Sequence, residues 1–522
     1  MRVLLINPPY PSTFWSFNKV TQVLGKKCVL PPLGLITVAA LFPEGASLTL
    51  VDMAAQELTE SHWDNHDVVF VTGMQIQQSG ILIAIKEGKR RAKTVVVGGP
   101  WAFHYHDKAL ESGADIVIRG ELESSMQDLI DALSQNKSGI VINSGIPDLN
   151  TSPVPRFDLL DLNLYMDMSI QFSRGCPFKC EFCDITLMFG RTVRTKSPQQ
   201  IISELDALYN LGWRGAIFFV DDNFIGSVVR AKALLKLLIG WQSDRGHPFE
   251  FYTQASVNLA RDDQLLDLIV RAGFAFVFLG IETLDSESLK SVGKVQNLAV
   301  DLDAACQKIN RAGLQVIAGC IIGFDNEAPG ADRRLIDFAV RNQIPEVFAT
   351  MLQAMPGTDL WKRVKEEGRL LCTGQDSLIS QTGRVNFVTT RPLQEITAEF
   401  INLYHDLYEP KNYLSRVYGH LIQMPRPSVK RNAEVKWNEV IGLIHLIARQ
   451  GLLYNSRKYF WKYLIYTLFN MPWKLRNFLI YCFRAEHYYH YPIIIEKELQ
   501  LHIMDGCPDV PSKTGPGSEL VL

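Results

Sequence analysis

Two successive series of short apolar segments constrain the fold of this chain more than any other feature of its sequence. Each segment is a continuous run rich in β-branched residues, and helical patterns lie between the segments. The first series consists of VLLIN (3–7), SLTLVDM (47–53), VVFVTGM (68–74), TVVVGGP (94–100) and DIVIRGE (115–121). Continuous rather than alternating apolar runs are typical of strands buried on both faces of a parallel sheet. We therefore expect a doubly wound, Rossmann-like α/β domain over residues 1–145.

The second series predicts a parallel barrel. Its segments are MSIQFS (168–173), GAIFFVD (215–221), FEFYTQA (249–255), AFVFLGI (275–281), VIAGCIIG (316–323) and EVFATMLQA (346–354). Six such units favour a partial, TIM-like (β/α)6 barrel over residues 162–394, with its chemistry at the C-terminal rim. A linker rich in Pro, Ser and Asp, residues 146–161, separates the barrel from the first domain.

From about residue 395 to residue 504 the pattern is helical, and residues 505–522 resemble a disordered tail. Residues 411–490 contain 13 Lys and Arg against 3 Asp and Glu, a local charge of +10, whereas the whole chain carries −2. Residues 454–491 hold 14 aromatic side chains. Two interpretations stay open: a helical cap whose aromatics form core, and basic amphipathic helices that lie on an anionic membrane surface.

The nine cysteines argue against a disulfide framework. Their number is odd, and only three of them are clustered, which favours a reducing cytoplasm. The N-terminal apolar run is too short for a signal peptide, and no stretch offers about 18 uninterrupted apolar residues for a spanning helix. A net charge of −2 argues against a broad nucleic-acid surface.

The clustered cysteines, Cys176, Cys180 and Cys183, lie in RGCPFKCEFCD, directly after the first predicted barrel strand. Thiolates at such spacing bind metal, but a closed zinc site needs four ligands, and no Cys or His pair of suitable spacing is near. An iron–sulfur cube also normally takes four cysteines. Three would leave one iron open to a substrate or cofactor; a zinc site or a purely structural cluster is the alternative.

This Cys-x3-Cys-x2-Cys motif after a first barrel strand resembles the radical S-adenosylmethionine (radical SAM) superfamily. The resemblance implies that the three cysteines hold a [4Fe–4S] cluster, whose open iron chelates S-adenosylmethionine. One electron from the cluster would then yield a 5′-deoxyadenosyl radical. The segment FVDDN stands where the family has its amine-binding motif, but it lacks the Gly-Gly-Glu sequence that is usual in that motif. The implied S-adenosylmethionine contacts are Phe182, Asp221, Asp222, Ser256, Asn258, Glu282, Gly323, Met355 and Pro356.

The order of domains resembles class B radical SAM methyltransferases with a cobalamin-binding domain, and in particular the branch with a helical C-terminal domain that includes hopanoid C-methylases. INPPY, PPLGL, VVVGGPWAF and IVIRGELE carry the resemblance in the first domain. The strand ends supply the cobalamin candidates, with Met74 and Gln75 expected under the corrin: Pro8, Asp52, Gly73, Met74, Gln75, Gly98, Gly99, Gly120 and Glu121.

The first domain departs from the cobalt-ligating pattern Asp-x-His-x-x-Gly. The nearest string, DNHDVV, lacks the glycine and precedes the third strand, so we interpret His66 as a surface loop residue. Many radical members of the group also lack the motif. A domain that has lost its cofactor and serves only as scaffold is the alternative.

The resemblance implies a C-methyltransferase that acts on an unactivated carbon of a polycyclic or lipid-like substrate, through a 5′-deoxyadenosyl radical and methylcobalamin. A reductant such as flavodoxin or ferredoxin would supply electrons. The protein would be cytoplasmic, with peripheral contact to the inner face of the membrane through the C-terminal helices. Two alternatives remain: a non-methylating ring closure, rearrangement or oxidation, and an iron–sulfur electron carrier or sensor.

Several other polar and sulfur-containing residues receive simpler interpretations. Arg174, beside the first clustered cysteine, would bind a carboxylate or cap the loop. The histidines of HYHD (104–107) and HYYH (487–490) are interpreted as solvated or packed rather than metal-binding. Four cysteines outside the cluster are interpreted as core residues: Cys306, Cys320, Cys372 and Cys482.

Overall fold

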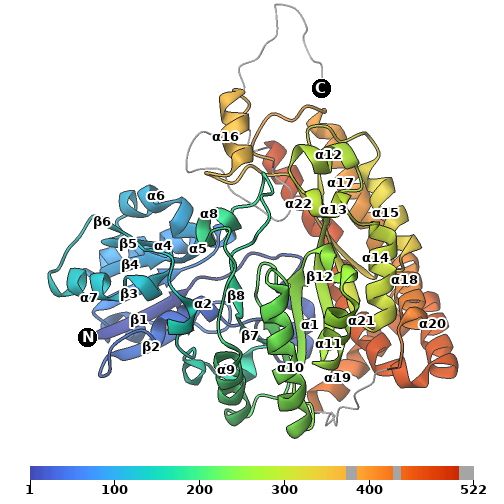
Figure 1. The fold of residues 1–522 in the computed structure, drawn as a ribbon, viewed down its shortest axis with the longest axis horizontal. Coiled ribbons are helices and arrows are strands. Elements are labelled where there is room, and N and C mark those ends of the chain that lie inside the picture. The colour runs from blue at the N-terminus through green and yellow to red at the C-terminus, as the bar shows by residue number, and fades with distance from the viewer. Residues whose placement is uncertain (372–384, 427–436, 505–522) are drawn as a thin grey trace, which may run out of the picture.

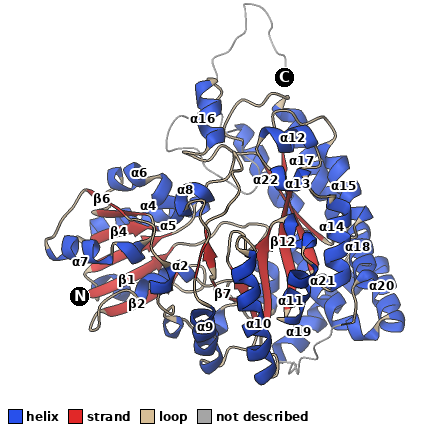
Figure 2. Ribbon diagram, viewed as in Figure 1, coloured by secondary structure: helices blue, strands red, loops and turns tan. Residues whose placement is uncertain are grey.

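The computed structural model describes residues 1–371, 385–426 and 437–504. The predicted tail 505–522 and Cys372 lie outside these residues. Figure 1 shows the N-terminal sheet on the left, the barrel strands in the centre and the C-terminal helices on the right. Figure 2 shows that the strands of the N-terminal part and those of the barrel form separate sheets.

The N-terminal sheet is parallel throughout and has the strand order β2-β1-β3-β4-β5-β6. Its strands are β1 (Arg2–Asn7), β2 (Ser47–Asp52), β3 (Val68–Thr72), β4 (Thr94–Gly98), β5 (Ile116–Arg119) and β6 (Ile140–Asn143). The helices are α1 (Asn18–Val23), α2 (Leu33–Ala39), α3 (Glu60–Asp64), α4 (Gln78–Arg90), α5 (Gly99–His104), α6 (His106–Glu111) and α7 (Met126–Ser134). The chain order reverses between β1 and β3, where open sheets of this kind bind ligands.

The second sheet is also parallel, and its order β14-β13-β12-β11-β10-β7 runs in chain sequence. Its strands are β7 (Met168–Ile170), β10 (Ala216–Phe219), β11 (Glu250–Ala255), β12 (Phe274–Glu282), β13 (Gln315–Ile322) and β14 (Glu346–Met351). The helices of this part are α8 (Ile185–Phe189), α9 (Pro198–Asn210), α10 (Val228–Asp244), α11 (Asp263–Arg271), α12 (Ser286–Ser291), α13 (Val295–Leu298), α14 (Leu302–Ala312), α15 (Ala331–Arg341) and α16 (Asp359–Glu366). Both β7 and β14 are edge strands, so the barrel is partial, as predicted.

The C-terminal part is helical. It comprises α17 (Leu393–Tyr408), α18 (Pro410–Gln423), α19 (Trp437–Leu446), the π-helix η7 (Ile447–Leu453), α20 (Arg457–Asn470), α21 (Leu475–Tyr488) and α22 (Tyr491–Met504). Within residues 1–371, 385–426 and 437–504, no helix combines the length and apolar character needed to cross a membrane.

Two tyrosines of α17 close the open edge of the barrel sheet. The Tyr404 hydroxyl donates to the carbonyl of Ala349 at 2.8 Å and accepts from its N–H at 3.0 Å. The Tyr408 hydroxyl bonds Val347 in the same way, at 2.7 and 2.9 Å. Both tyrosines are buried. The outward backbone groups of β14 are therefore satisfied by side chains instead of a seventh strand.

The predicted helical cap is present at this edge. The rings of Tyr404, Tyr488 and Tyr491 surround Phe14, which comes from the loop after β1. Phe14 and these three tyrosines are almost fully buried. Many C-terminal aromatics thus form core, and they join the N-terminal loop to the end of the barrel.

Candidate active site

The three clustered cysteines lie in a loop that a short antiparallel pair of strands closes. β8 (Ser173–Arg174) pairs with β9 (Arg194–Thr195) just beyond the C-terminal end of β7. We call residues 175–193 between them the cluster loop. Gly175 has φ +92°, and a Cβ there would stand 2.8 Å from the Thr192 carbonyl oxygen and 2.9 Å from that of Gly190. The loop can close in this way only with glycine at its first position.

Cys176, Cys180 and Cys183 are free and half-buried. Burial raises the pKa of all three thiols, so a metal must displace their protons. Among the described residues, no three Cys, His, Asp or Glu side chains already have the arrangement of a loaded metal site. Assignment of the three thiols to a cluster therefore rests on their spacing and their place at the strand ends. Three thiolate donors fit an iron–sulfur cluster whose fourth iron is free to bind another ligand.

The two aspartates of FVDDN have different surroundings. Asp221 is fully buried, and its oxygens accept hydrogen bonds from the backbone N–H groups of Phe172 and Ser173 and from the Ser173 hydroxyl. It therefore fixes the segment between β7 and β8. Asp222 Oδ2 is buried without a hydrogen-bond partner in the described part of the chain. Burial, followed by Asp221 and Asp184, raises the pKa of Asp222 to about 7. An oxygen of this kind fits the amine of S-adenosylmethionine, a role that stays a prediction.

Glu282, another predicted contact, forms an ion pair that no motif in the sequence indicates. It ends β12 with φ +64° and lies 2.5 Å from Lys294 Nζ. Burial alone would lower the pKa of Lys294, but Glu282 and the thiols of Cys180 and Cys183 raise it. A buried cation thus stands close to the cluster loop. Only the folded chain brings it there, since GKVQN contains no recognisable motif.

The segment around Lys294 also carries unpaired amide oxygens. Gln296 Nε2 lies 3.8 Å from Cys180 Sγ. Within the described residues, Gln296 Oε1 and Asn297 Oδ1 are buried without hydrogen-bond partners. Asn258 Oδ1, after β11, is in the same state. Orphaned acceptors at one rim are the groups expected to receive donors from a polar ligand.

The remaining predicted S-adenosylmethionine contacts also lie at strand ends. The ring of Phe182 is 6.2 Å from that of Phe324, next to Gly323 at the end of β13. Gly323 has φ +96° and donates its N–H to Glu327 at 2.7 Å. The Ser256 N–H donates to Asn223 Oδ1 at 3.1 Å after β11. Met355 and Pro356 are partly buried after β14. Their roles toward the cofactor stay predictions.

The structure uses several cobalamin candidates for internal contacts. Asp52 is buried, accepts from Asn7 Nδ2 at 2.9 Å and from the Tyr165 hydroxyl at 3.1 Å, and so joins β1, β2 and the segment before β7. The Pro8 carbonyl accepts from Gln77 Nε2 at 2.5 Å. Neither Asp52 nor the Pro8 carbonyl needs a ligand to satisfy it.

The glycine candidates also have packing roles of their own. A Cβ on Gly99, which has φ +85°, would clash with Thr72 Oγ1, and one on Gly73 would stand 2.9 Å from Ile81. Gly98 closes β4, and Gly120 has φ +117° beside Ser144. Met74 remains 48% exposed at the end of β3, and Gln75 opens the following turn. These two residues stand at the strand-order reversal, where the predicted corrin contact remains a prediction.

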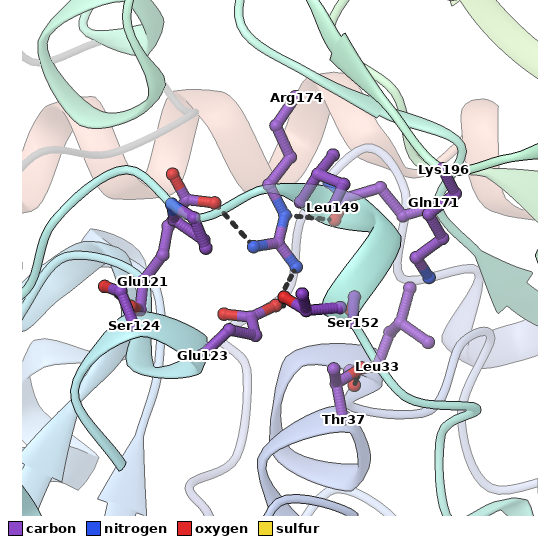
Figure 3. Close-up of polar contacts among 12 residues, drawn as sticks. Leu33, Thr37, Glu121, Glu123, Ser124, Leu149, Ser152, Gln171, Arg174 and Lys196 are labelled. Carbon is purple, nitrogen blue, oxygen red and sulfur yellow. Dashed lines mark hydrogen bonds and ion pairs between the residues drawn. The ribbon is translucent and has the colours of Figure 1, made fainter. Parts of the chain in front are cut away.

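Glu121 forms ion pairs across the two domains, and Figure 3 shows the one with Arg174. It lies 2.6 Å from Arg174 and 2.6 Å from Arg194, the residues that flank the cluster loop. Arg174 also pairs with Glu123 at 2.8 Å and donates to Gln171. The Glu121 side chain is only 3% exposed. Its carboxylate is thus engaged by two guanidinium groups, and Arg174 pairs with two carboxylates of the chain itself.

A second cross-domain contact involves a histidine of HYHD, for which a solvated or packed position is predicted. His104 Nε2 at the end of α5 lies 3.0 Å from Asp184 Oδ2, directly after Cys183, and the histidine side chain is 2% exposed. We call His104, Glu121 and Glu123, with their partners Asp184, Arg174 and Arg194, the interdomain clasp. The clasp holds the cluster loop against the C-terminal end of β5.

The interpretation of His66 as a surface loop residue is wrong. The residue is 6% exposed. Its Nδ1 is 2.6 Å from the His62 carbonyl oxygen, and its Nε2 is 2.8 Å from Thr49 Oγ1. His66 follows α3 and packs back onto β2, because one ring nitrogen finds its partner on α3 and the other on β2.

Comparison with known families and proteins agrees with this geometry. Residues 170–339 match the radical SAM superfamily, and residues 358–500 match a domain of unknown function, DUF4070. A protein of Synechocystis sp. named as an uncharacterized methyltransferase is 43% identical over 97% of this chain and 94% of its own length. The hopanoid C-2 methylase of Rhodopseudomonas palustris is 30% identical over 93% of this chain and 92% of its own.

A solved structure shares the fold. It is the radical SAM methyltransferase TsrM from Kitasatospora setae, with cobalamin and a [4Fe–4S] cluster bound. The likeness has a TM-score of 0.61 at 16% identity and covers 86% of this chain and 98% of that one. The predicted fold class is confirmed by this likeness and by the two parallel sheets.

Proposed function

Because this chain belongs to the radical SAM methyltransferase family that includes the hopanoid C-2 methylase, we propose that it methylates an unactivated carbon of a polycyclic, lipid-like substrate. Such a carbon has no acidic proton, so acid–base chemistry cannot activate it and a radical can. The cofactors of the proposal are a [4Fe–4S] cluster, S-adenosylmethionine and cobalamin.

The observation that supports this substrate class is an aromatic wall on the barrel sheet. It consists of Phe218, Tyr252, Phe276, Phe278 and Phe348. The rings of Phe218 and Tyr252 stack at 4.8 Å, and those of Tyr252 and Phe276 stack at 4.3 Å. Trp15, from the loop after β1, extends the wall at 5.7 Å from Phe278 and 5.4 Å from Phe348.

The wall lies on the face of the sheet opposite the helices. The alternate residues Phe219 and Phe251 are fully buried, and the Phe251 ring packs near Phe249, which stacks on Trp241 of α10. Side chains alternate between faces along a strand, so the wall residues point away from these helices. Apart from Tyr252, they are only half-buried. A surface made mainly of aromatic rings fits an apolar ring system rather than a sugar or a peptide.

The proposed roles of the chain's own residues are binding and orientation. Cys176, Cys180 and Cys183 would hold the cluster, Asp222 would accept from the amine of S-adenosylmethionine, and Lys294 would donate to its carboxylate. Bound there, the cluster supplies the electron that splits S-adenosylmethionine, and cobalamin supplies the methyl group. The interdomain clasp brings the strand ends of the two domains together, so that the three reactants are held in register.

The proposal also includes an electron donor and a location in the cell. A low-potential electron carrier such as flavodoxin or ferredoxin would reduce the cluster, and a lipid-like substrate would place the enzyme on the cytoplasmic side, peripheral to the inner face of the membrane.

The test is anaerobic reconstitution with iron, sulfide and cobalamin, followed by desalting, a visible spectrum and assays with reductant, S-adenosylmethionine and a pentacyclic lipid in detergent. The proposal predicts retained corrin bands, 5′-deoxyadenosine, and a product heavier than the lipid by one methylene. Cys180→Ala should abolish 5′-deoxyadenosine formation. Cys28→Ala, which alters a half-buried cysteine outside the cluster loop, should leave it intact.

The outcomes separate the alternatives. Formation of 5′-deoxyadenosine with a product of lower or unchanged mass would replace methylation by ring closure, oxidation or rearrangement. Iron–sulfur absorbance without cleavage of S-adenosylmethionine would favour an electron carrier or sensor. Loss of all corrin on desalting would make the N-terminal domain a scaffold.

A further inference from the structure

The outer helix of the C-terminal part, α20, exposes an apolar face. Of its 14 residues only Phe460, Tyr463 and Thr467 are buried. Its outward side chains include Phe469, which is 79% exposed, and others exposed by 37–47%. The exposed apolar residues of the helix are Trp461, Ile465, Tyr466, Leu468 and Phe469. Figure 1 shows α20 at the right-hand margin of the molecule, with the C-terminal helices between it and the barrel strands.

Neighbouring elements extend this face at both ends of the helix. Near its start, Trp461 Nε1 donates to the Gly451 carbonyl at 2.8 Å, which brings α20 beside Leu452 and Leu453, exposed by 64% and 73%. After its end, Trp473 is 44% exposed beneath the Arg426 guanidinium, 4.0 Å from the ring centroid. We call the five exposed apolar residues of α20, with Leu452, Leu453 and Trp473, the α20 face.

The charges around this face have one sign. Arg457, Lys458 and Lys462 are exposed on α20, and the helix sequence RKYFWKYLIYTLFN contains no acidic residue. The Lys462 ammonium lies 5.7 Å from the centre of the Tyr466 ring. Across residues 411–490 the balance is +10, while the remaining residues sum to −12. The exposed apolar residues therefore lie in the basic part of an otherwise acidic chain.

We propose that the α20 face lies on the surface of an anionic lipid bilayer, with the helix parallel to the membrane plane. Tryptophan and tyrosine favour the water–lipid boundary, aliphatic and phenyl groups enter the acyl region, and lysines pair with anionic headgroups. A helix of 14 residues presents about 21 Å of such contact along its axis. The proposal rests on the proposed function only for its purpose, delivery of a lipid-like substrate. The binding itself needs no substrate.

The experiment uses the full-length protein and vesicle flotation. Vesicles of phosphatidylcholine alone are compared with vesicles that also contain phosphatidylglycerol, at low and high salt. The protein should float with the anionic vesicles, remain behind with the neutral ones, and be released by salt. Lys458→Gln with Lys462→Gln should weaken binding by roughly 30-fold, and Phe469→Ser by on the order of 10-fold.

Matched control variants separate this face from any exposed apolar or basic residue. Val229 on α10 is 80% exposed, close to the exposure of Phe469. Lys236 lies on the same helix and is also exposed. Val229→Ser and Lys236→Gln should bind vesicles like the wild type. All variants alter exposed residues, so equal thermal midpoints are expected and are measured first.

Three results would overturn the proposal. The first is no flotation with anionic vesicles, and the second is flotation that the α20 variants leave unchanged. The third is a dimer in light scattering that Phe469→Ser dissociates, because the acidic remainder of a second copy would then be the partner of this face. Vesicle binding without methyl transfer would fault the proposed function alone, and methyl transfer in detergent without vesicle binding would fault this inference alone.

Discussion

At the residue scale, Glu121 is the carboxylate on which the interdomain clasp depends. Replacement by glutamine would leave the buried guanidinium groups of Arg174 and Arg194 without one negative partner. We expect Glu121→Gln to lower the free energy of unfolding by about 3 kcal/mol, because a broken buried ion pair leaves an uncompensated charge. Urea denaturation at neutral pH measures this effect.

The matched control is an exposed ion pair of the linker. Arg156 and Asp158 lie 2.7 Å apart, with side chains 42% and 52% exposed. Asp158→Asn should change the free energy of unfolding by less than about 1 kcal/mol, since solvent screens such pairs. Equal effects of Glu121→Gln and Asp158→Asn would show that the clasp contributes no more to the free energy of unfolding than an ion pair on the surface does.

The buried carboxyl of Glu327 should make the free energy of unfolding depend on pH. It is 3% exposed and accepts from the Thr283 hydroxyl at 3.0 Å. Burial raises its pKa to about 6 from 4.5. The folded chain therefore holds this proton more tightly than the unfolded chain. The contribution of the group to the free energy of unfolding is greatest below pH 4.5 and falls as pH rises through 6, by about 2 kcal/mol in all.

Glu327→Gln should remove this fall. The difference in urea stability between variant and wild type should shift in favour of the variant by about 2 kcal/mol from pH 4.5 to pH 7.5. Comparison of the two proteins at each pH cancels the titration of all other groups. A difference that does not change with pH would mean that the carboxyl titrates equally in the folded and unfolded chains.

Residues of the candidate site were predictable only where they belong to a recognisable sequence motif. Cys176, Cys180 and Cys183 follow from their spacing and from the strand before them. Lys294 and His104 were not predictable, because each stands near the cluster loop through a contact between distant segments. The twin aspartates show a further limit. Their sequence neighbourhood is shared, and only the fold makes Asp221 an internal acceptor and leaves an oxygen of Asp222 unpaired.

At the scale of elements, closure of the cluster loop depends on Gly175. An alanine there would keep the left-handed φ of +92° and bring its Cβ within 3.2 Å of three backbone carbonyl oxygens. We expect Gly175→Ala to reduce the iron content after reconstitution at least several-fold. Iron analysis and absorbance of the desalted protein measure the loss.

Gly212 supplies the control for Gly175. It has a similar φ of +87°, and a Cβ at this position would meet no atom within 4 Å. Gly212→Ala should therefore show only the conformational cost of about 1–2 kcal/mol and should bind normal amounts of iron. Normal iron in Gly175→Ala would contradict the role given to the loop geometry.

The tyrosine pair of α17 makes a second prediction at this scale. Tyr404→Phe and Tyr408→Phe each remove the hydroxyl that satisfies an N–H and a carbonyl of β14, so each should lower the free energy of unfolding by about 2 kcal/mol. Tyr466→Phe, at a residue that is 44% exposed, should have little effect. Thermal and urea unfolding measure the stability of all three variants. If Tyr404→Phe left the free energy of unfolding unchanged, water would be replacing the hydroxyl.

The strands were predictable because apolar side chains line both faces of each parallel sheet, which gives continuous apolar runs. β6 was missed, since its four residues IVIN give too short a signal between polar segments. The pair β8 and β9 was also missed, because two-residue strands leave no pattern in the sequence. Composition likewise left two interpretations of the C-terminal helices, and burial shows which aromatics form core.

At the scale of the whole molecule, the order of the three parts was predictable and their contacts were not. The loop after β1 places Phe14 among C-terminal tyrosines and Trp15 against the barrel sheet. Segments at opposite ends of the chain therefore complete the barrel together. No periodicity records such a contact, because it depends on shape rather than on the local pattern.

The two halves of the interdomain clasp come in a fixed order along the chain. His104, Glu121 and Glu123 all precede the cluster loop that they hold. During synthesis the N-terminal domain leaves the ribosome first, and domains fold as units. The surface that receives the loop is then complete before its cysteines emerge. We therefore expect the N-terminal half of the clasp to be in place when the cysteines emerge, so that iron and sulfide are delivered to a loop that already has its docking surface.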